Sequence, residues 1–131
     1  MMEKAILVTA DNQVSIVDFP EPTSEAAIKA INATIGSDCF ETVSGCLPDG
    51  HIMVVDESGL IKNRPVNLLA SGFYGFDKSP IVGDVLFLMV GFRNGERDLI
   101  GFSAEEAEDY RKMYADTLEL LLTGEPLHIL V

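Results

Sequence analysis

Basic residues are scarce in this sequence. Only 9 Lys and Arg stand against 21 Asp and Glu among 131 residues, which gives a formal net charge of −12 at pH 7. A protein that binds the nucleic acid backbone needs a basic surface, because Lys and Arg displace the condensed counterions. Docking on anionic lipid also needs positive charge on the protein surface. The composition therefore argues against direct contact with nucleic acid or with a membrane surface.

Long apolar runs are also missing. No segment approaches the roughly 20 apolar residues of a membrane-spanning helix. The N-terminal Met-Met-Glu-Lys leads only into a short apolar-rich stretch at residues 5–10. A secretory signal peptide has a longer apolar region and a small-residue cleavage site. We therefore expect a cytoplasmic protein.

Cysteine and histidine occur only twice each, as Cys39, Cys46, His51 and His128. Zinc knuckles and redox pairs have two residues between their cysteines, a spacing that this sequence does not have. A zinc site would require all four side chains to converge from distant parts of the chain. We expect neither a metal nor a cofactor, and two reduced thiols that are at least partly buried.

What the chain does have is enough apolar material for one domain. Its 131 residues match the usual domain size, and 47% of them are hydrophobic. Apolar residues alternate in strands and recur every three or four positions in helices. The predicted strands cover residues 4–9, 13–19, 40–44, 51–56, 82–92 and 99–102. Three helices are predicted. Two begin near residues 23 and 65, and the longest covers residues 104–122.

The densest apolar run predicts the centre of the sheet. Residues 85–90 are all apolar, which is typical of a strand covered on both faces. Tight turns between successive strands, above all Asn94-Gly95, make neighbouring strands antiparallel. The prediction is one α+β domain over residues 1–131. It has a mainly antiparallel sheet of about six strands, with two long helices and one short helix on one face.

Local signals predict where the helices begin. Ser103 and Glu106 have the spacing of a capping box ahead of the last helix. Pro65 is expected to open the short helix, because proline is favoured at the first helical position. The stripe that the first helix is expected to bury is Ile28, Ile31 and Ile35. The apolar tail after residue 122 (residues 123–131) is expected to pack on the domain or to build a homodimer.

The last predicted helix carries a cluster of acidic residues. They are Glu105, Glu106, Glu108, Asp109, Asp116 and Glu119. Carboxylates along a rigid helix can imitate the charge track of a nucleic acid duplex and speed the encounter with a basic partner. The alternative is a solvated outer face, with acids favoured in the first turn. Residues 37–60 add five acids and no base, which favours a recognition surface.

A second candidate site lies at the start of the short helix. Asn63, Arg64 and Asn67 could hold a phosphate or carboxylate there, since free backbone N–H groups point outward at a helix start. Arg93 is the fourth predicted contact, if the fold brings it near. The alternative is an ordinary asparagine cap beside an exposed arginine. If the site is real, the protein binds a nucleotide or another small ligand.

Asp84 and His51 are the residues that a small hydrolase would use. Asp84 lies beside Gly83 at the start of the most apolar strand, and a buried carboxylate needs a partner. No second carboxylate has a defined spacing from it, so a turn residue that accepts backbone N–H groups is favoured. His51, which leads a strand, is expected to be structural. The motifs of phosphate loops, dinucleotide-binding turns and nucleophile elbows are absent from the sequence.

Several short motifs together resemble one family. They are the strand at residues 4–8, Ile35-Gly36, residues 54–59, Asn63-Arg64, residues 81–84 and residues 103–106. Over about residues 4–118 the chain resembles the domain of unknown function (DUF) 3846 family of phages, plasmids and other bacterial mobile elements. It departs from the family pattern at Ile61-Lys62, in residues 72–80 and in the tail. The resemblance implies an origin and a shape, and no particular reaction.

The leading hypothesis is a non-enzymatic accessory protein of a phage or mobile element. It would bind stoichiometrically to a host or defence protein with a basic surface, as an inhibitor of the anti-restriction or anti-CRISPR type, and imitate nucleic acid. A small-ligand or nucleotide sponge is the alternative, and a small hydrolase is the third hypothesis.

Overall fold

The structure, a computed structural model, describes residues 3–19, 24–47, 50–93 and 95–124. Its strands are β1 (Glu3–Val8), β2 (Val14–Phe19), β3 (Phe40–Val43), β4 (His51–Asp56), β5 (Val85–Arg93) and β6 (Glu96–Ile100). Its helices are α1 (Ser24–Ile35), α2 (Leu68–Tyr74) and α3 (Ala104–Thr123). The predicted α+β class with six antiparallel strands is confirmed. His128 and the rest of the tail from residue 125 lie outside the described ranges.

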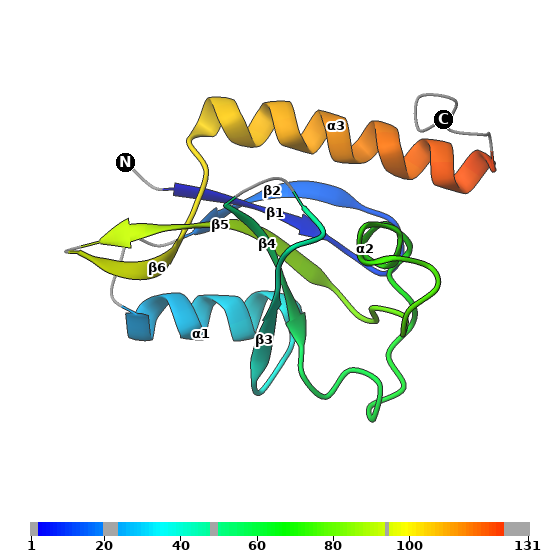
Figure 1. The fold of residues 1–131 in the computed structure, drawn as a ribbon, viewed down its shortest axis with the longest axis horizontal. Coiled ribbons are helices and arrows are strands. Elements are labelled where there is room, and N and C mark those ends of the chain that lie inside the picture. The colour runs from blue at the N-terminus through cyan, green and yellow to red at the C-terminus, as the bar shows by residue number, and fades with distance from the viewer. Residues whose placement is uncertain (1–2, 20–23, 48–49, 94, 125–131) are drawn as a thin grey trace.

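The sheet is built around β5, which crosses the middle of the molecule (Figure 1). The strand order is β2-β1-β5-β4-β3, and β6 pairs with β5 beside this path. One side of β5 therefore carries β1 on its first half and β6 on its second half. All pairs are antiparallel, as the tight turns predicted. The path ends at β2 and at β3.

Helices cover both faces of the sheet, with α1 on one face and α2 and α3 on the other (Figure 1). One core cluster packs Ile31 and Ile35 of α1 against Leu88 of β5. The other packs Tyr114 of α3 against Phe87 of β5. The prediction that all helices share one face is wrong. An apolar stripe indicates that one side of a helix is buried, but it does not indicate against which face of the sheet the helix packs.

The start of α3 follows the predicted local signal, but the buried stripe of α1 differs from the prediction at one residue. Ser103 and Glu106 form the predicted capping box at the start of α3. In α1 the buried stripe is Ala27, Ile31 and Ile35, whereas Ile28 is 47% exposed. Residues four apart lie on one helix face, and Ile28 is turned about 100° from that face. The expected stripe is therefore wrong at Ile28.

The short helix α2 begins later than the proline rule predicts. Asn67 is its N-cap and accepts a hydrogen bond from the Ala70 N–H. Val66 is still extended and forms an isolated bridge with Val82. Pro65 therefore precedes the helix instead of opening it, because backbone pairing holds the next residue in the extended region.

Candidate functional site

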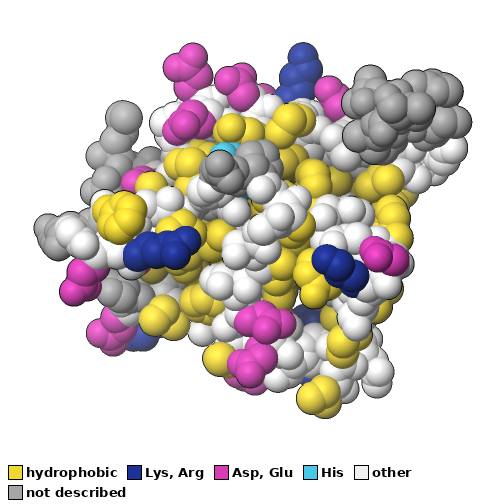
Figure 2. All heavy atoms as spheres, viewed as in Figure 1, with side chains coloured by type: hydrophobic (Ala, Val, Ile, Leu, Met, Phe, Trp, Pro, Cys, Tyr) yellow, Lys and Arg dark blue, Asp and Glu magenta, His cyan; other side chains and the backbone are white. Residues whose placement is uncertain are grey.

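The acidic residues predicted on the last helix lie on the exposed side of α3. Ala107, Tyr114 and Leu118 are buried and fix which side of the helix faces the sheet. All six predicted acids are exposed. Figure 2 shows acidic side chains gathered along the top of the molecule, over the N-terminal half of α3. The fold therefore presents these carboxylates outward on one rigid element.

Two of the six acids have partners within α3. Glu106 accepts the Ser103 N–H in the capping box. Glu108 pairs with Arg111, whose hydrogen bond and charge hold the pKa of this carboxyl below its usual value. The four acids that form no salt bridge among the described residues are Glu105, Asp109, Asp116 and Glu119, although the charge of Asp116 acts on Arg111. They extend over about 21 Å at the rise of an α-helix.

The Asn63-Arg64 segment forms a different arrangement, built around Asp56 at the end of β4. The Asp56 carboxylate is buried and accepts the Arg64 Nε–H at 2.9 Å and the Lys62 Nζ at 3.0 Å. It also accepts the Ser58 N–H at 3.0 Å. Burial raises the pKa of this carboxyl, but the Ser58 N–H and the two cations outweigh burial and hold the pKa below its usual value. Asp56 is therefore a paired anion that fixes the loop after β4.

Arg64 lies over two glycines. A Cβ at Gly83 would lie 2.8 Å from Arg64 Cδ, and Gly83 has φ +81°. A Cβ at Gly36 would lie 3.7 Å from the guanidinium, which also donates to the Gly36 carbonyl. The side chain thus connects the end of α1, the end of β4 and the approach to β5. Of the predicted alternative, the asparagine cap is confirmed at Asn67, but the exposed arginine is wrong, because the Arg64 side chain is 29% exposed and its guanidinium has internal partners.

Asn67 is fully buried, and its amide is committed to the backbone. Nδ2 donates to the carbonyls of Val8 and Gly83, each at 2.9 Å, and Oδ1 accepts the Ala70 N–H at 3.1 Å. One amide therefore ties β1, the approach to β5 and the start of α2 together. Together, Asp56, Arg64 and Asn67 form what we call the Arg64 cluster.

The four residues predicted for a small ligand do not come together. Asn67 is enclosed, and Arg64 is paired with Asp56. Asn63 is exposed in a turn with φ +57°. Arg93 ends β5, which starts near the Arg64 cluster and runs about 26 Å away at the usual strand rise. The structure therefore does not assemble this set into one site.

Asp84 and His51 both have structural surroundings. Asp84 Oδ1 accepts the Ala10 N–H at 3.0 Å, so it supports the turn after β1. His51 is buried under α3, with its ring 4.8 Å from the Tyr110 ring and 5.5 Å from the Phe102 ring. Its Nδ1 has no hydrogen-bond partner among the described residues. Burial lowers the pKa of His51, and the charge of Glu106 opposes this shift.

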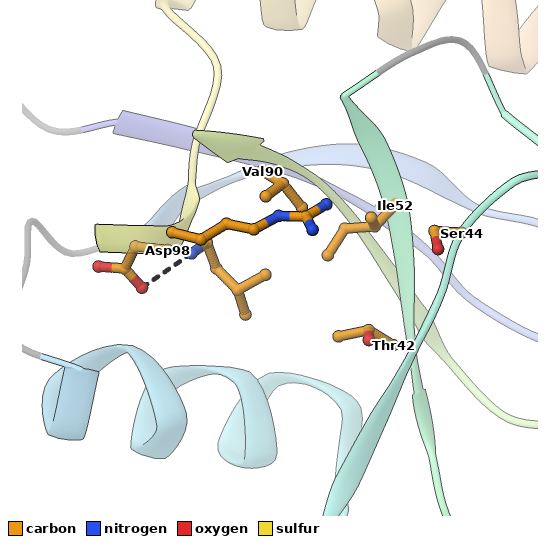
Figure 3. A pocket seen from close by; sticks show the side chains of 7 residues that line it. Thr42, Ser44, Ile52, Val90 and Asp98 are labelled. Carbon is orange, nitrogen blue, oxygen red and sulfur yellow. Dashed lines mark hydrogen bonds between the residues drawn. The ribbon is translucent and has the colours of Figure 1, made fainter. Parts of the chain in front are cut away.

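A hollow that sequence reasoning missed opens on the α1 face of the sheet (Figure 3). It measures about 390 Å³, and Figure 3 shows Thr42 and Ser44 on the β3 side and Asp98 on the β6 side. A second hollow of about 460 Å³ flanks the opposite face of β3. Neither is signalled by a motif, because each joins residues that are distant in sequence. Strand pairing brings the residues of the first hollow together, whereas the second joins β3 to Leu60, to Tyr74 of α2 and to residues 79–81.

The two thiols differ in exposure. Cys46 is half-buried, but Cys39 is exposed, so the expectation of partial burial is wrong for Cys39. A hydrogen bond with Glu57 and the negative charge of that carboxylate raise the pKa of the Cys39 thiol. Within the described ranges, no group of three or more His, Cys, Asp or Glu residues could hold a metal ion. No helix in the same ranges is long and apolar enough to cross a membrane.

The chain belongs to the family "Domain of unknown function (DUF3846)", whose pattern matches residues 2–115. No curated protein shows significant similarity to it. Among solved structures it resembles the "Crystal structure of small RNA methyltransferase HEN1", with a TM-score of 0.54 and 14% sequence identity. The match covers 85% of this chain and 16% of that one. At this identity the likeness concerns the fold alone.

Proposed function

We propose that the protein is a non-enzymatic accessory protein that binds another protein stoichiometrically through the exposed face of α3. The partner presents a basic surface that otherwise contacts nucleic acid. The observation that carries the proposal is the set of unpaired carboxylates on one rigid, outward-facing helix of a chain with net charge −12. Such a strip attracts a basic partner over long range and repels nucleic acid itself.

The partner class follows from the charge. Proteins that bind a phosphate backbone expose Lys and Arg. Glu105, Asp109, Asp116 and Glu119 follow one another at intervals of about 6, 10 and 5 Å along the axis of α3. A host or defence protein that processes nucleic acid therefore fits the α3 face. Inhibition of the anti-restriction or anti-CRISPR type, by a protein of phage or mobile-element origin, is the specific form of this proposal.

The alternative of a small-ligand sponge has less support. Its predicted residues are separated, and two of them, Arg64 and Asn67, are committed to internal hydrogen bonds. The hypothesis of a hydrolase based on Asp84 or His51 has the least support, because Asp84 already accepts a backbone N–H and His51 is packed between aromatic rings.

Matched charge variants test the proposal. The test variant carries Glu105→Gln, Asp109→Asn and Glu119→Gln on α3. The control carries Glu57→Gln, Asp77→Asn and Glu96→Gln, the same charge change on exposed residues elsewhere. Binding to a panel of nucleic-acid-processing enzymes is measured by titration calorimetry at low and high salt. We expect the wild-type protein and the control variant to bind, and the α3 variant to lose binding. High salt should weaken binding, since surface charges are screened beyond about 10 Å at 0.1 M salt. Equal loss in both variants, or binding indifferent to salt, would reject the proposal.

A further inference from the structure

We propose a second interaction surface, independent of α3: the outer edge of β3 pairs with an extended segment of a partner protein in which Lys or Arg alternates with apolar residues. The segment would add a strand to the sheet beside Phe40–Val43. Strand addition of this kind gains affinity from main-chain hydrogen bonds and selectivity from alternate side chains.

The backbone of β3 has hydrogen-bonding groups that point away from the sheet. Cys39 O accepts the Glu57 N–H, so this pair is a hydrogen-bonded one, and pairing alternates along antiparallel strands. Glu41 and Val43 therefore bond to β4, whereas the N–H and C=O groups of Phe40 and Thr42 face outward. The pairing of β4 with β5 leads to the same assignment. Val90 N donates to Gly50 O, and alternation along β4 then places Val54 among the residues bonded to β5. Val54 lies opposite Thr42, so its backbone groups point away from β3.

Within β3 this edge has no lysine, no proline and no bulge, while the strand is four residues long and carries one charged side chain, Glu41. Edge strands commonly have a lysine, a proline or a bulge that blocks further pairing. β3 reads Phe-Glu-Thr-Val and pairs with β4 in continuous register from Phe40 opposite Asp56 to Val43 opposite Met53. It is the last strand of the path β2-β1-β5-β4-β3. An incoming strand can therefore continue the sheet.

Hollows lie on both sides of this edge, where alternate side chains of an added strand would point. On the α1 face, Thr42 and Ser44 line the hollow of about 390 Å³, whose floor includes Ile52 (Figure 3). On the opposite face, Glu41 and Val43 line the hollow of about 460 Å³ together with Leu60, Tyr74 and Ile81. Leu60 is 57% exposed, so apolar surface is available beside the edge.

The charge near the edge selects the partner. Glu41 and Glu57 are exposed, and the Asp38 side chain is 99% exposed with Lys62 3.8 Å away. A Lys or Arg opposite Glu41 can lay its stem on the apolar rim and bring its charge to the carboxylate. A second copy of this chain fits poorly. Pairing of two β3 strands about Thr42 would set both Glu41 residues diagonally on one face, about 7–8 Å apart, between two chains of net charge −12.

The test uses the peptide acetyl-Lys-Val-Lys-Val-Lys-Val-amide as the probe. Titration calorimetry gives its affinity, and amide hydrogen exchange reports where it binds. In the free protein the Thr42 amide should exchange fast, while the amides of Glu41 and Val43 are protected. We expect the peptide to slow exchange at Thr42. Thr42→Pro should weaken binding about tenfold or more, since it removes an outward backbone donor and obstructs the edge. Thr42→Ala should leave binding within about twofold because the backbone is unchanged.

Two controls keep the result interpretable. The Thr42 N–H is not used by β4, so the proline variant should keep protected amides at Glu41 and Val43. A peptide with N-methyl groups on alternate residues removes the partner's donors without altering the protein, and it should bind about tenfold more weakly. Equal binding of the Thr42→Pro variant, equal binding of a Glu-Val peptide, or a wild-type dimer that Thr42→Pro dissociates would overturn the proposal. None of these readouts involves α3.

Discussion

The Arg64 cluster and the α3 face are both polar, but they differ in where their hydrogen bonds and charges are satisfied. In the cluster, the Asp56 carboxylate and the Asn67 amide are buried and fully partnered within the chain. On α3, four exposed carboxylates form no salt bridge among the described residues. The first arrangement is already used by the fold, and the second is available to another molecule.

The comparison also explains what the family motifs do in this chain. Asn63-Arg64 and residues 81–84 carry much of the resemblance, and the structure brings Arg64 against Gly83. These motifs therefore build the connection between α1, β4 and β5. A motif that looks like a ligand site in the sequence is here a structural contact.

The largest expected effect is the loss of the buried amide in the Arg64 cluster. Asn67→Leu leaves the carbonyls of Val8 and Gly83 and the Ala70 N–H without their partner. Each buried unsatisfied group costs about 1–3 kcal/mol, so urea unfolding should show a loss of about 3 kcal/mol or more. Asn67→Asp keeps the acceptor for Ala70 but buries a carboxylate against two carbonyl oxygens, so at pH 7 it should destabilise the chain at least as much. A change below about 1 kcal/mol for Asn67→Leu would show that this amide is not a structural tie.

The same arginine substitution in both regions sharpens the comparison. Arg64→Met removes one of two cations from a buried carboxylate and should lower the free energy of unfolding by about 2 kcal/mol, somewhat less than the break of a whole buried pair. Arg111→Met removes an exposed partner of Glu108 and should leave the free energy of unfolding nearly unchanged. Equal losses in urea unfolding would contradict the distinction between the regions.

Steric contact with Gly83 provides a coupled measurement. Gly83→Ala places a Cβ 2.8 Å from Arg64 Cδ, so the alanine should destabilise the wild-type chain more than the Arg64→Ala variant. Residues in contact typically show coupling energies of about 0.5–3 kcal/mol in a double-mutant cycle. The strain of φ +81° remains in both backgrounds. Additive losses would mean that Arg64 does not lie over Gly83.

Acidification should weaken the attachment of α3 at His51. Burial lowers the pKa of His51 in the folded protein below its ordinary value of 6.5. The unfolded chain therefore takes up the proton first, and the stability due to neutral His51 is present above pH 6.5 and lost as the pH falls through the folded pKa. Urea unfolding between pH 7 and 5 should show this loss. His51→Gln should flatten the slope, while His128→Gln should keep it. The lowered pKa of Asp56 acts separately, below its ordinary value of 3.8.

The smallest effect on stability is expected on the α3 face itself. Glu105→Gln, Asp109→Asn and Glu119→Gln should each change the free energy of unfolding by about 0.5 kcal/mol or less, as is usual for exposed sites. Thermal unfolding in low salt measures the sum. A large gain on neutralisation would show strong mutual repulsion, and a large loss would show hidden pairing within the helix.

Local patterns predicted much of the fold. The apolar run at residues 85–90 predicted a central strand covered on both faces, and β5 is that strand. Its Leu88 packs on the α1 side of the sheet and its Phe87 packs on the α3 side. The capping box of Ser103 and Glu106 placed the start of α3. These features depend on neighbours in the sequence, which a pattern contains.

Features that depend on distant residues could not be read in the same way. Residues 37–60 contain five acids and no base, yet Asp56 is paired with Lys62 and Arg64 just beyond that range. Asn67 looked like a ligand residue because its partners Val8 and Gly83 belong to other strands. The exposed edge of β3 is visible only once the strand order is known.

A competition assay tests the central claim most directly. A nucleic-acid-processing enzyme that binds the chain is loaded with a fluorescent DNA duplex, and the protein is titrated in. If the α3 face occupies the enzyme's basic surface, wild-type protein and the control variant Glu57→Gln, Asp77→Asn, Glu96→Gln displace the duplex, while the α3 variant Glu105→Gln, Asp109→Asn, Glu119→Gln does not. Displacement by the α3 variant at wild-type concentrations, or a stable ternary complex with the duplex still bound, would contradict the account.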